Sequence, residues 1–110
     1  QKMPSKIVVV IGVLTRNKQK RGRPFFNTAA VIEKGKTAKY FNKILLPTGD
    51  VFDEARFIEA GDPEVERVFR VKSWRVGVTI CEDIWAWDLP GQRNPYQNNP
   101  IKKVANWTPD

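Results

Sequence analysis

Residues 75–85 read Arg75-Val-Gly-Val-Thr-Ile-Cys-Glu-Asp-Ile-Trp85, and the apolar part of this stretch ends on the only cysteine of the chain. Larger and smaller side chains alternate along it, which predicts a strand with the valines and Ile80 on one face. Cys81 then shares the other face with Gly77 and Thr79, two small residues that leave room beside its sulfur. A thiol at the end of a strand, with space around it, is a candidate nucleophile.

The chain contains no histidine. A cysteine nucleophile needs a base, and in this chain the base must be a carboxylate, with a lysine or an arginine as the electrostatic helper. The alternative for Cys81 is a buried and chemically inert cysteine.

The composition describes one folded domain at most. The chain has 110 residues, 41% of them hydrophobic, and four tryptophans, so it is long enough to bury a core. No apolar run reaches the ~18 residues of a transmembrane helix, and residues 7–14 are typical of a strand rather than a signal peptide. A single cysteine forms no internal disulfide, which favours a reducing, cytoplasmic location without membrane association.

The net charge of +7 is unevenly distributed, because five of the 19 Lys and Arg residues lie between Arg16 and Arg23. The simple interpretation of this basic loop is a solvated surface loop. The alternative is a patch that binds phosphate or nucleic acid. No aromatic residue lies within the loop and no nucleic-acid-binding motif surrounds it, so a nucleic-acid partner is not expected.

The pattern along the chain predicts strands with little helix. The predicted strands are, in order, residues 7–14, residues 26–33 paired with 37–43, and residues 65–71 paired with 75–80. The first is a continuous β-branched run, typical of a strand buried on both faces. Residues 52–58 form either a short helical turn or an extended loop, and residues 88–106 form a long loop with a short helix near 100–105. This order fits a small β domain or the strand-rich middle of a larger α/β fold.

Three segments carry candidate chemistry. Lys43 ends a predicted strand, so its ammonium can reach into a cleft, and the alternative is an exposed lysine. Residues 51–56, Val-Phe-Asp-Glu-Ala-Arg, hold two acidic side chains and one basic one, and their alternative is a surface salt-bridge cluster of little energetic value. The third segment surrounds Cys81.

Together the three segments resemble the carbon–nitrogen hydrolase (nitrilase) superfamily, and within it the glutaminase domain of the glutamine-dependent NAD synthetase branch. The matching motifs are Lys43-Ile-Leu-Leu-Pro47, Asp50-Val-Phe-Asp-Glu-Ala-Arg-Phe57 and Gly77-Val-Thr-Ile-Cys-Glu-Asp-Ile-Trp85, in the family's order. The stretch Asn27-Thr-Ala-Ala-Val-Ile-Glu33 also fits. The resemblance implies an α/β fold, part of a nitrilase-type α-β-β-α sandwich of which this chain is the strand-rich middle portion.

The resemblance also implies a reaction. Cys81 would attack the side-chain amide carbon of glutamine, form a thioester and release ammonia, and water would then free glutamate. Lys43 and the backbone N–H of Glu82 would stabilise the oxyanion, while Glu54 would position Lys43 or the attacking water. The residues implied to shape the substrate pocket are Phe52, Asp53, Arg56 and Trp85.

No metal site and no cofactor is expected in this segment. The resemblance places ATP and magnesium in a separate synthetase domain that this sequence does not contain. It implies glutamine as the substrate, used for NAD synthesis, and a homo-oligomer in the full-length protein.

One residue of the family pattern is missing. The family's general base is a glutamate upstream of the lysine, but the only glutamate before Lys43 is Glu33, at a predicted hairpin turn. We therefore expect residues 1–110 to be a partial domain, truncated at both ends and inactive by itself. The alternatives are a stand-alone amidase of the same superfamily that acts on another amide, a non-catalytic basic binding module and an inert fragment.

Overall fold

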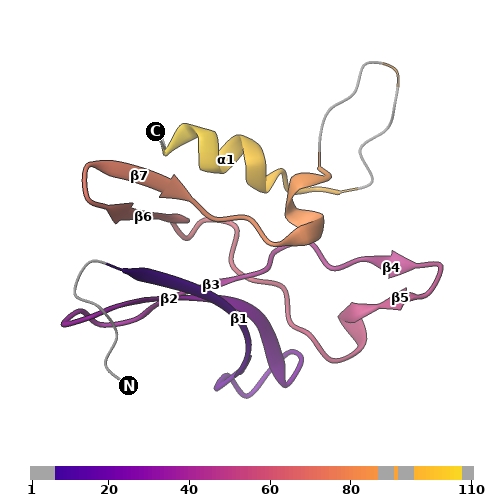
Figure 1. Cartoon of the computed structure of the whole chain (residues 1–110). Coiled ribbons are helices and arrows are strands. Elements are labelled where there is room, and N and C mark those ends of the chain that lie inside the picture. The colour runs from indigo at the N-terminus through magenta and orange to yellow at the C-terminus, as the bar shows by residue number, and fades with distance from the viewer. Residues whose placement is uncertain (1–6, 87–90, 92–95, 108–110) are drawn as a thin grey trace.

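The computed structural model of the chain describes residues 7–86, 91 and 96–107 (Figure 1). Most of its elements are short antiparallel strands. In chain order they are β1 (Val8–Arg16), β2 (Phe25–Glu33), β3 (Lys39–Asn42), β4 (Thr48–Gly49), β5 (Phe52–Asp53), the 3-10 helix η1 (Glu54–Arg56), β6 (Val68–Val71), β7 (Trp74–Gly77), the 3-10 helix η2 (Cys81–Ile84) and α1 (Pro100–Asn106). The described residues are therefore rich in strands and carry little helix, as the sequence predicts.

β2 is the central strand of a three-stranded antiparallel sheet with the order β1-β2-β3. Val13 on β1 lies opposite Thr28 on β2, which in turn lies opposite Asn42 on β3. The turn between β2 and β3 contains Gly35 with a φ of +77°, a left-handed conformation that glycine adopts without steric cost. The predicted hairpin of residues 26–33 and 37–43 is confirmed.

β1 is a strand, as predicted, but it is not buried on both faces. Among the described strands it pairs with β2 alone, so it lies at the edge of the sheet. Leu14 is 68% exposed, and Val10 and Ile11, which point to opposite faces, are exposed as well. The prediction of two-sided burial is wrong because, of the β1 residues, only Val8 packs against the core cluster of the described structure, so residues on both faces of the strand stay exposed.

β6 and β7 form the second predicted hairpin. Val71 pairs with Trp74 across a two-residue connection. The strands are shorter than predicted, but the pairing continues past them, because the Val78 N–H donates to the Arg67 carbonyl at 2.8 Å. The chain therefore stays anchored as it approaches Cys81.

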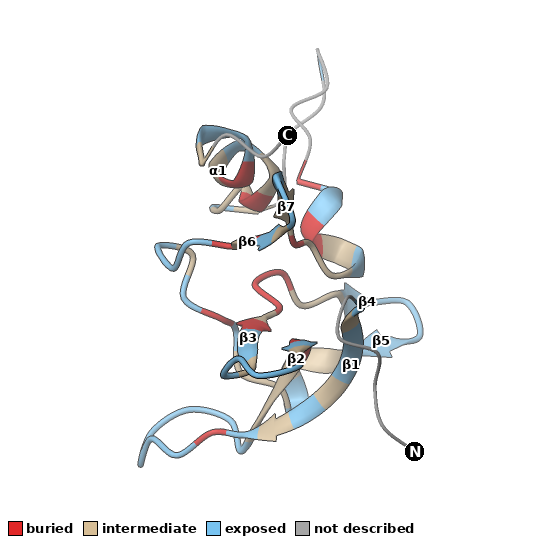
Figure 2. Cartoon of the chain, turned by 60° about the vertical axis from the view of Figure 1, so that its left-hand side comes forward, coloured by how far each residue is buried: buried red, intermediate tan, exposed pale blue. Residues whose placement is uncertain are grey.

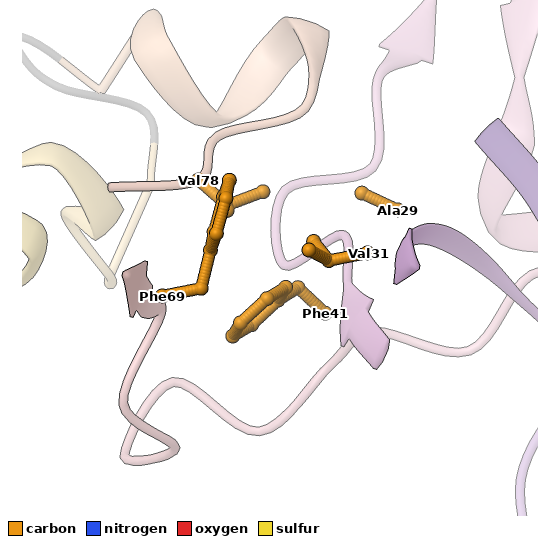
Figure 3. Close-up of a cluster of buried hydrophobic side chains, with 5 residues drawn as sticks. All are labelled: Ala29, Val31, Phe41, Phe69 and Val78. Carbon is orange, nitrogen blue, oxygen red and sulfur yellow. The ribbon is translucent and has the colours of Figure 1, made fainter. Parts of the chain in front are cut away.

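The hydrophobic core lies between the three-stranded sheet and the β6–β7 hairpin. Its buried members are Ala29, Val31, Phe41, Phe69 and Val78 (Figure 3). The Phe41 and Phe69 rings are tilted by 35° with centroids 6.4 Å apart, a favourable aromatic geometry. Val76 and Ile80 pack against this cluster, so the predicted alternation that turns them toward the core is confirmed.

A buried segment follows β3 and passes between the two sheets. Lys43, Ile44 and Leu45 are all buried, and Figure 2 shows this stretch between the three-stranded sheet and the β6, β7 and η2 segments. Ile44 and Leu45 form a second apolar cluster with Ala86, which follows η2. This packing brings the lysine segment next to the segment that carries the cysteine.

Residues 52–58 contain both structures that the sequence left open, because the short strand β5 leads directly into η1. The predicted short helix is α1. It begins after Asn99, whose side-chain oxygen accepts a hydrogen bond from the Lys102 N–H at 3.0 Å, and Pro100 occupies its first turn. Much of the predicted long loop lies outside the described residues. No helix in the described ranges is long and apolar enough to cross a membrane.

Candidate active site

The Cys81 thiol lies where the backbone changes direction abruptly. Ile80 is extended, with φ of −125° and ψ of 109°, whereas Cys81 begins η2 with a φ of +47°. A left-handed backbone is uncommon for residues other than glycine, and strained residues of this kind cluster at functional sites. Cys81 is exposed, so the alternative of a buried cysteine is wrong, and its reactivity stays a prediction.

Lys43 is held in a buried ion pair. Its side chain is 3% exposed, and its Nζ lies 2.5 Å from Oε2 of Glu54. Oε1 of Glu54 accepts a hydrogen bond from the Asn27 side-chain amide at 2.9 Å. The alternative of an exposed lysine is therefore wrong, and Glu54 makes the direct contact that a positioning role requires.

The backbone explains why these side chains meet. The Lys43 N–H donates to the Asn27 carbonyl at 2.7 Å, which extends the pairing of β2 and β3 by one step. The β4–β5 hairpin then folds the chain back, and the Glu54 N–H donates to the Pro47 carbonyl at 3.3 Å. Lys43 and Glu54 are 11 positions apart in the sequence, and the chain between them forms a loop that closes on the ion pair.

Asp83 connects the lysine segment to the cysteine segment. It is fully buried. Its Oδ1 accepts hydrogen bonds from the backbone N–H groups of Ile44 at 3.0 Å and Leu45 at 2.8 Å. Its Oδ2 accepts from the N–H of Ile80, the residue before Cys81, at 3.1 Å. One carboxylate thus bonds to both segments.

Arg67 is the ionic partner of Asp83, and both side chains are buried. Its Nη2 lies 3.3 Å from Oδ2 of Asp83. Its Nε donates to the Val78 carbonyl at 3.1 Å, and its Nη1 donates to the Asn42 carbonyl. Burial lowers the pKa of the Arg67 guanidinium, an effect that the Asp83 carboxylate opposes, and arginine stays charged in proteins.

Glu82 follows Cys81 in η2, and the N–H groups of a first helical turn have no partner inside their own helix. Its side chain accepts a hydrogen bond from the Tyr96 hydroxyl. The pKa of Tyr96 is raised to about 12, chiefly by burial and further by the hydrogen bond to Glu82 and by the charge of Glu82. The Tyr96 ring also packs against the apolar cluster of Ile44 and Leu45, so η2 and the lysine segment share a neighbour.

The four residues predicted to shape a substrate pocket lie at the surface of the described structure. Phe52, Asp53, Arg56 and Trp85 are all exposed. The Arg56 guanidinium lies 5.5 Å from the ring centroid of Phe57, a cation–π contact within its own short loop. Their role in a pocket stays a prediction.

Three residues of this arrangement are not identified by the sequence pattern: Asn27, Arg67 and Asp83. Asp83 accepts the N–H of Ile80, the residue that precedes the helix, as the third residue of a capping box does, but Ile80 is not the Ser or Thr that marks this motif in a sequence. Arg67 carries no local signal, since its partners Asn42 and Asp83 are 25 and 16 residues away in the sequence.

The basic loop has the features of a surface loop. All five of its Lys and Arg residues are exposed. Asn17 holds the loop together, since its side chain donates to the Arg23 carbonyl at 2.9 Å and accepts from the Gln19 N–H at 3.0 Å. Glu59 and Asp62 line the cavity beside the loop together with its basic residues, so the charge there is mixed. Within the described ranges, no three Cys, Asp or Glu residues are grouped as a metal ion would require.

Comparison with known proteins identifies the relatives of this chain. The carbon-nitrogen hydrolase family profile matches residues 3–89. The glutamine-dependent NAD(+) synthetase of Synechocystis is 38% identical over 109 residues, which are 96% of this chain and 19% of that protein. The enzyme of the same name from Thermotoga maritima is 43% identical over 60 residues, or 54% of this chain and 10% of that protein. The chain therefore spans less than a fifth of these curated relatives.

A solved structure supports the same relationship. The glutamine-dependent NAD+ synthetase from Acinetobacter baumannii, in complex with adenosine diphosphate, superposes with a TM-score of 0.70 at 33% sequence identity. The match covers 92% of this chain and 16% of that one.

Proposed function

The chain belongs to the carbon–nitrogen hydrolase family, and from that membership we propose that it is the thiol-bearing part of a glutaminase domain. The observation that carries the proposal is the pairing of a buried Lys43–Glu54 ion pair with an exposed Cys81, on two segments that one carboxylate joins. The likeness to NAD synthetases at 33–43% identity supports glutamine as the amide.

In the proposed reaction, the Cys81 sulfur attacks the side-chain amide carbon of glutamine. The carbonyl oxygen becomes an oxyanion, which the Lys43 ammonium and the Glu82 N–H stabilise. A general base takes the thiol proton and passes it to the amide nitrogen, the C–N bond breaks, ammonia leaves, and a thioester remains on Cys81. Water hydrolyses the thioester and frees glutamate and the thiol. Glu54 holds Lys43 in place throughout.

The general base is proposed to come from outside these 110 residues. Glu33 is the only glutamate before Lys43. It ends β2 at the opposite end of the β2–β3 hairpin from Asn27, and its carboxylate pairs with Lys36 at 2.9 Å. We therefore propose that the chain is part of a longer protein with an α-β-β-α sandwich, in which a further domain uses the ammonia for NAD synthesis.

The proposal is tested in the complete gene product that contains this chain. Purified protein is expected to release ammonia and glutamate from glutamine in equal amounts, and Cys81→Ala is expected to abolish the release. Ser73→Ala, a change in the β6–β7 turn, is the matched control and should retain the activity. Hydrolysis that survives Cys81→Ala, or that occurs with another amide and not with glutamine, contradicts the glutaminase proposal.

The 110-residue chain alone provides a second test. Because it lacks the proposed base, it is expected to release no ammonia from glutamine above a protein-free blank. Release above the blank that disappears in Cys81→Ala would show that the base lies within these residues.

A further inference from the structure

Strand pairing alone does not fix the lysine relative to the cysteine. Lys43 follows β3 in the three-stranded sheet, whereas Cys81 follows β7 in a separate two-stranded sheet. No strand ladder among the described residues connects the two sheets. Apolar packing brings the two segments together but is not directional, so a group that bonds to both segments can fix the position of the ammonium relative to the thiol.

The Asp83 carboxylate is such a group. It accepts four donors within 3.3 Å, which are the N–H groups of Ile44, Leu45 and Ile80 and the Arg67 guanidinium. Hydrogen bonds to an ionised acceptor are short and roughly twice as strong as neutral ones. Two of the donors follow Lys43 directly, and one precedes Cys81 directly.

Arg67 extends the connection in both directions. It donates to the carbonyl of Asn42, which precedes Lys43, and to the carbonyl of Val78, three residues before Cys81. The buried Arg67–Asp83 pair thus contacts the backbone on both sides of Lys43 and along the approach to Cys81.

We infer that Asp83, supported by Arg67, is a positioning residue. It fixes the position of the Lys43 ammonium relative to the Cys81 thiol for attack on the amide. Asp83 touches neither the thiol nor the ammonium in the described contacts, so it acts through the backbone of the residues that carry them. The inference rests on the proposed glutaminase function and names the device that aligns its two reacting groups.

Asp83→Asn is the substitution that isolates this role, because it keeps the shape of the side chain. The asparagine oxygen can still accept two N–H groups, but its amide nitrogen is a donor and faces other donors. If the oxygen stays with Ile44 and Leu45, Ile80 loses its acceptor. If the amide turns over, the lysine segment loses its acceptor instead. In either orientation the carboxylate no longer joins the two segments.

The experiment compares kcat and KM for glutamine in the complete gene product. In Asp83→Asn, kcat is expected to fall by about 10²-fold, the effect of a displacement near 1 Å at a reacting centre. KM is expected to change less than kcat, because the substitution acts on the alignment of the two reacting groups, on which the chemical step depends most steeply. Circular dichroism and the thermal midpoint show whether each variant is folded at the assay temperature.

Phe69→Leu is the matched control, since it disturbs the core without touching the carboxylate. It is expected to lower the thermal midpoint and to retain kcat while folded. If Asp83→Asn does not fold, Arg67→Lys replaces it. Arg67→Lys keeps the positive charge beside Asp83 but loses the planar guanidinium that donates to two backbone carbonyls. The expected fall in kcat is smaller than in Asp83→Asn.

The outcomes separate the two hypotheses. A parent protein that does not hydrolyse glutamine overturns the glutaminase proposal, and this inference with it. If the parent is active and the folded Asp83→Asn variant keeps its kcat, only the positioning role is overturned. If Asp83→Asn does not fold, an unchanged kcat in Arg67→Lys has the same meaning. An equal fall of kcat in Phe69→Leu also overturns it, because the effect would then follow stability.

Discussion

Two kinds of ion pair occur in the described structure, and they differ in burial. The Lys43–Glu54 and Arg67–Asp83 pairs are at most 17% exposed on either side. In the Lys36–Glu33 and Lys103–Glu64 pairs, the Lys36 and Glu64 side chains are 66% and 77% exposed. Exposed pairs contribute little because water and salt compete with them.

The difference in burial indicates which ion pairs have a role in the proposed reaction rather than in the stability of the fold. Both buried pairs make further hydrogen bonds, Glu54 to Asn27 and Asp83 to three backbone N–H groups, and both lie at the candidate site. A well-packed apolar pair is often at least as stable as a buried ion pair. Burial of two such pairs in a chain of 110 residues is therefore weak evidence of stabilisation and fits a site that needs fixed charges.

The largest effect is expected from Arg67→Met, which leaves the Asp83 carboxylate buried without its cation. Removing one partner of a buried pair destabilises by about 3–5 kcal/mol. Chemical denaturation of the 110-residue chain, followed by tryptophan fluorescence, measures the loss. The double variant Arg67→Met/Asp83→Asn removes both charges and is expected to recover part of it. A loss no larger than that of a surface substitution would erase the distinction between the two kinds of pair.

A smaller loss is expected from Glu54→Gln, which keeps the shape of the side chain but removes the negative charge beside Lys43. A hydrogen bond between charged groups contributes about 1.5–3 kcal/mol, and the same denaturation experiment measures it. Asn27→Ala serves as the comparison, because it removes one neutral donor to Glu54 and is expected to lower stability by about 1 kcal/mol. The reverse order would show that Asn27, not the charge pair, holds the cluster.

The Tyr96–Glu82 contact is intermediate between the buried and the exposed pairs. Because the pKa of Tyr96 is raised to about 12 from 10.0, the folded chain keeps a proton that the unfolded chain loses first. The stability from this group is fully present below pH 10 and is lost as the pH rises through about 12. The chain has two tyrosines, so phenolate absorbance in a Tyr40→Phe variant reports Tyr96 alone. Glu82→Gln is expected to move the midpoint down, and an unchanged midpoint would rule out the carboxylate as a cause.

The smallest effects are expected at the surface pairs. Lys36→Ala and Lys103→Ala should each change the free energy of unfolding by no more than ~0.5 kcal/mol. Repeating the denaturation at high salt should leave these small values near zero, because salt screens exposed charges. A loss as large as that of Glu54→Gln would mean that burial does not separate the two kinds of pair.

Local pattern is enough to predict much of this fold. The two hairpins and the helix after Asn99 follow from alternation, turn residues and a capping side chain, all of which act within a few residues. The position of Cys81 at the end of an extended run follows in the same way. The two-sided burial predicted for residues 7–14 is wrong because the apolar content of a strand does not show which of its faces other elements cover.

The contacts between distant segments are harder to predict from the sequence than the local elements are. Lys43 and Glu54 are each identified by the family resemblance, but their ion pair depends on how the β4–β5 hairpin closes. The Arg67–Asp83 pair requires that two separate sheets meet, and no local pattern around Arg67 indicates this. The pocket residues Phe52 and Trp85 follow from resemblance alone, and the described structure leaves both on its surface.

The left-handed backbone at Cys81 lowers the stability of the fold at the position that carries the reactive thiol of the proposed mechanism. Glycine adopts a φ of +47° without steric cost, whereas a side chain there costs roughly 1–2 kcal/mol. Random mutation filtered for folding alone would thus tend to replace the cysteine by glycine and gain stability while losing the only thiol. The backbone at Cys81 lowers the stability of the fold at the residue on which the proposed chemistry depends. Such a trade-off is expected where selection acts on activity rather than on stability.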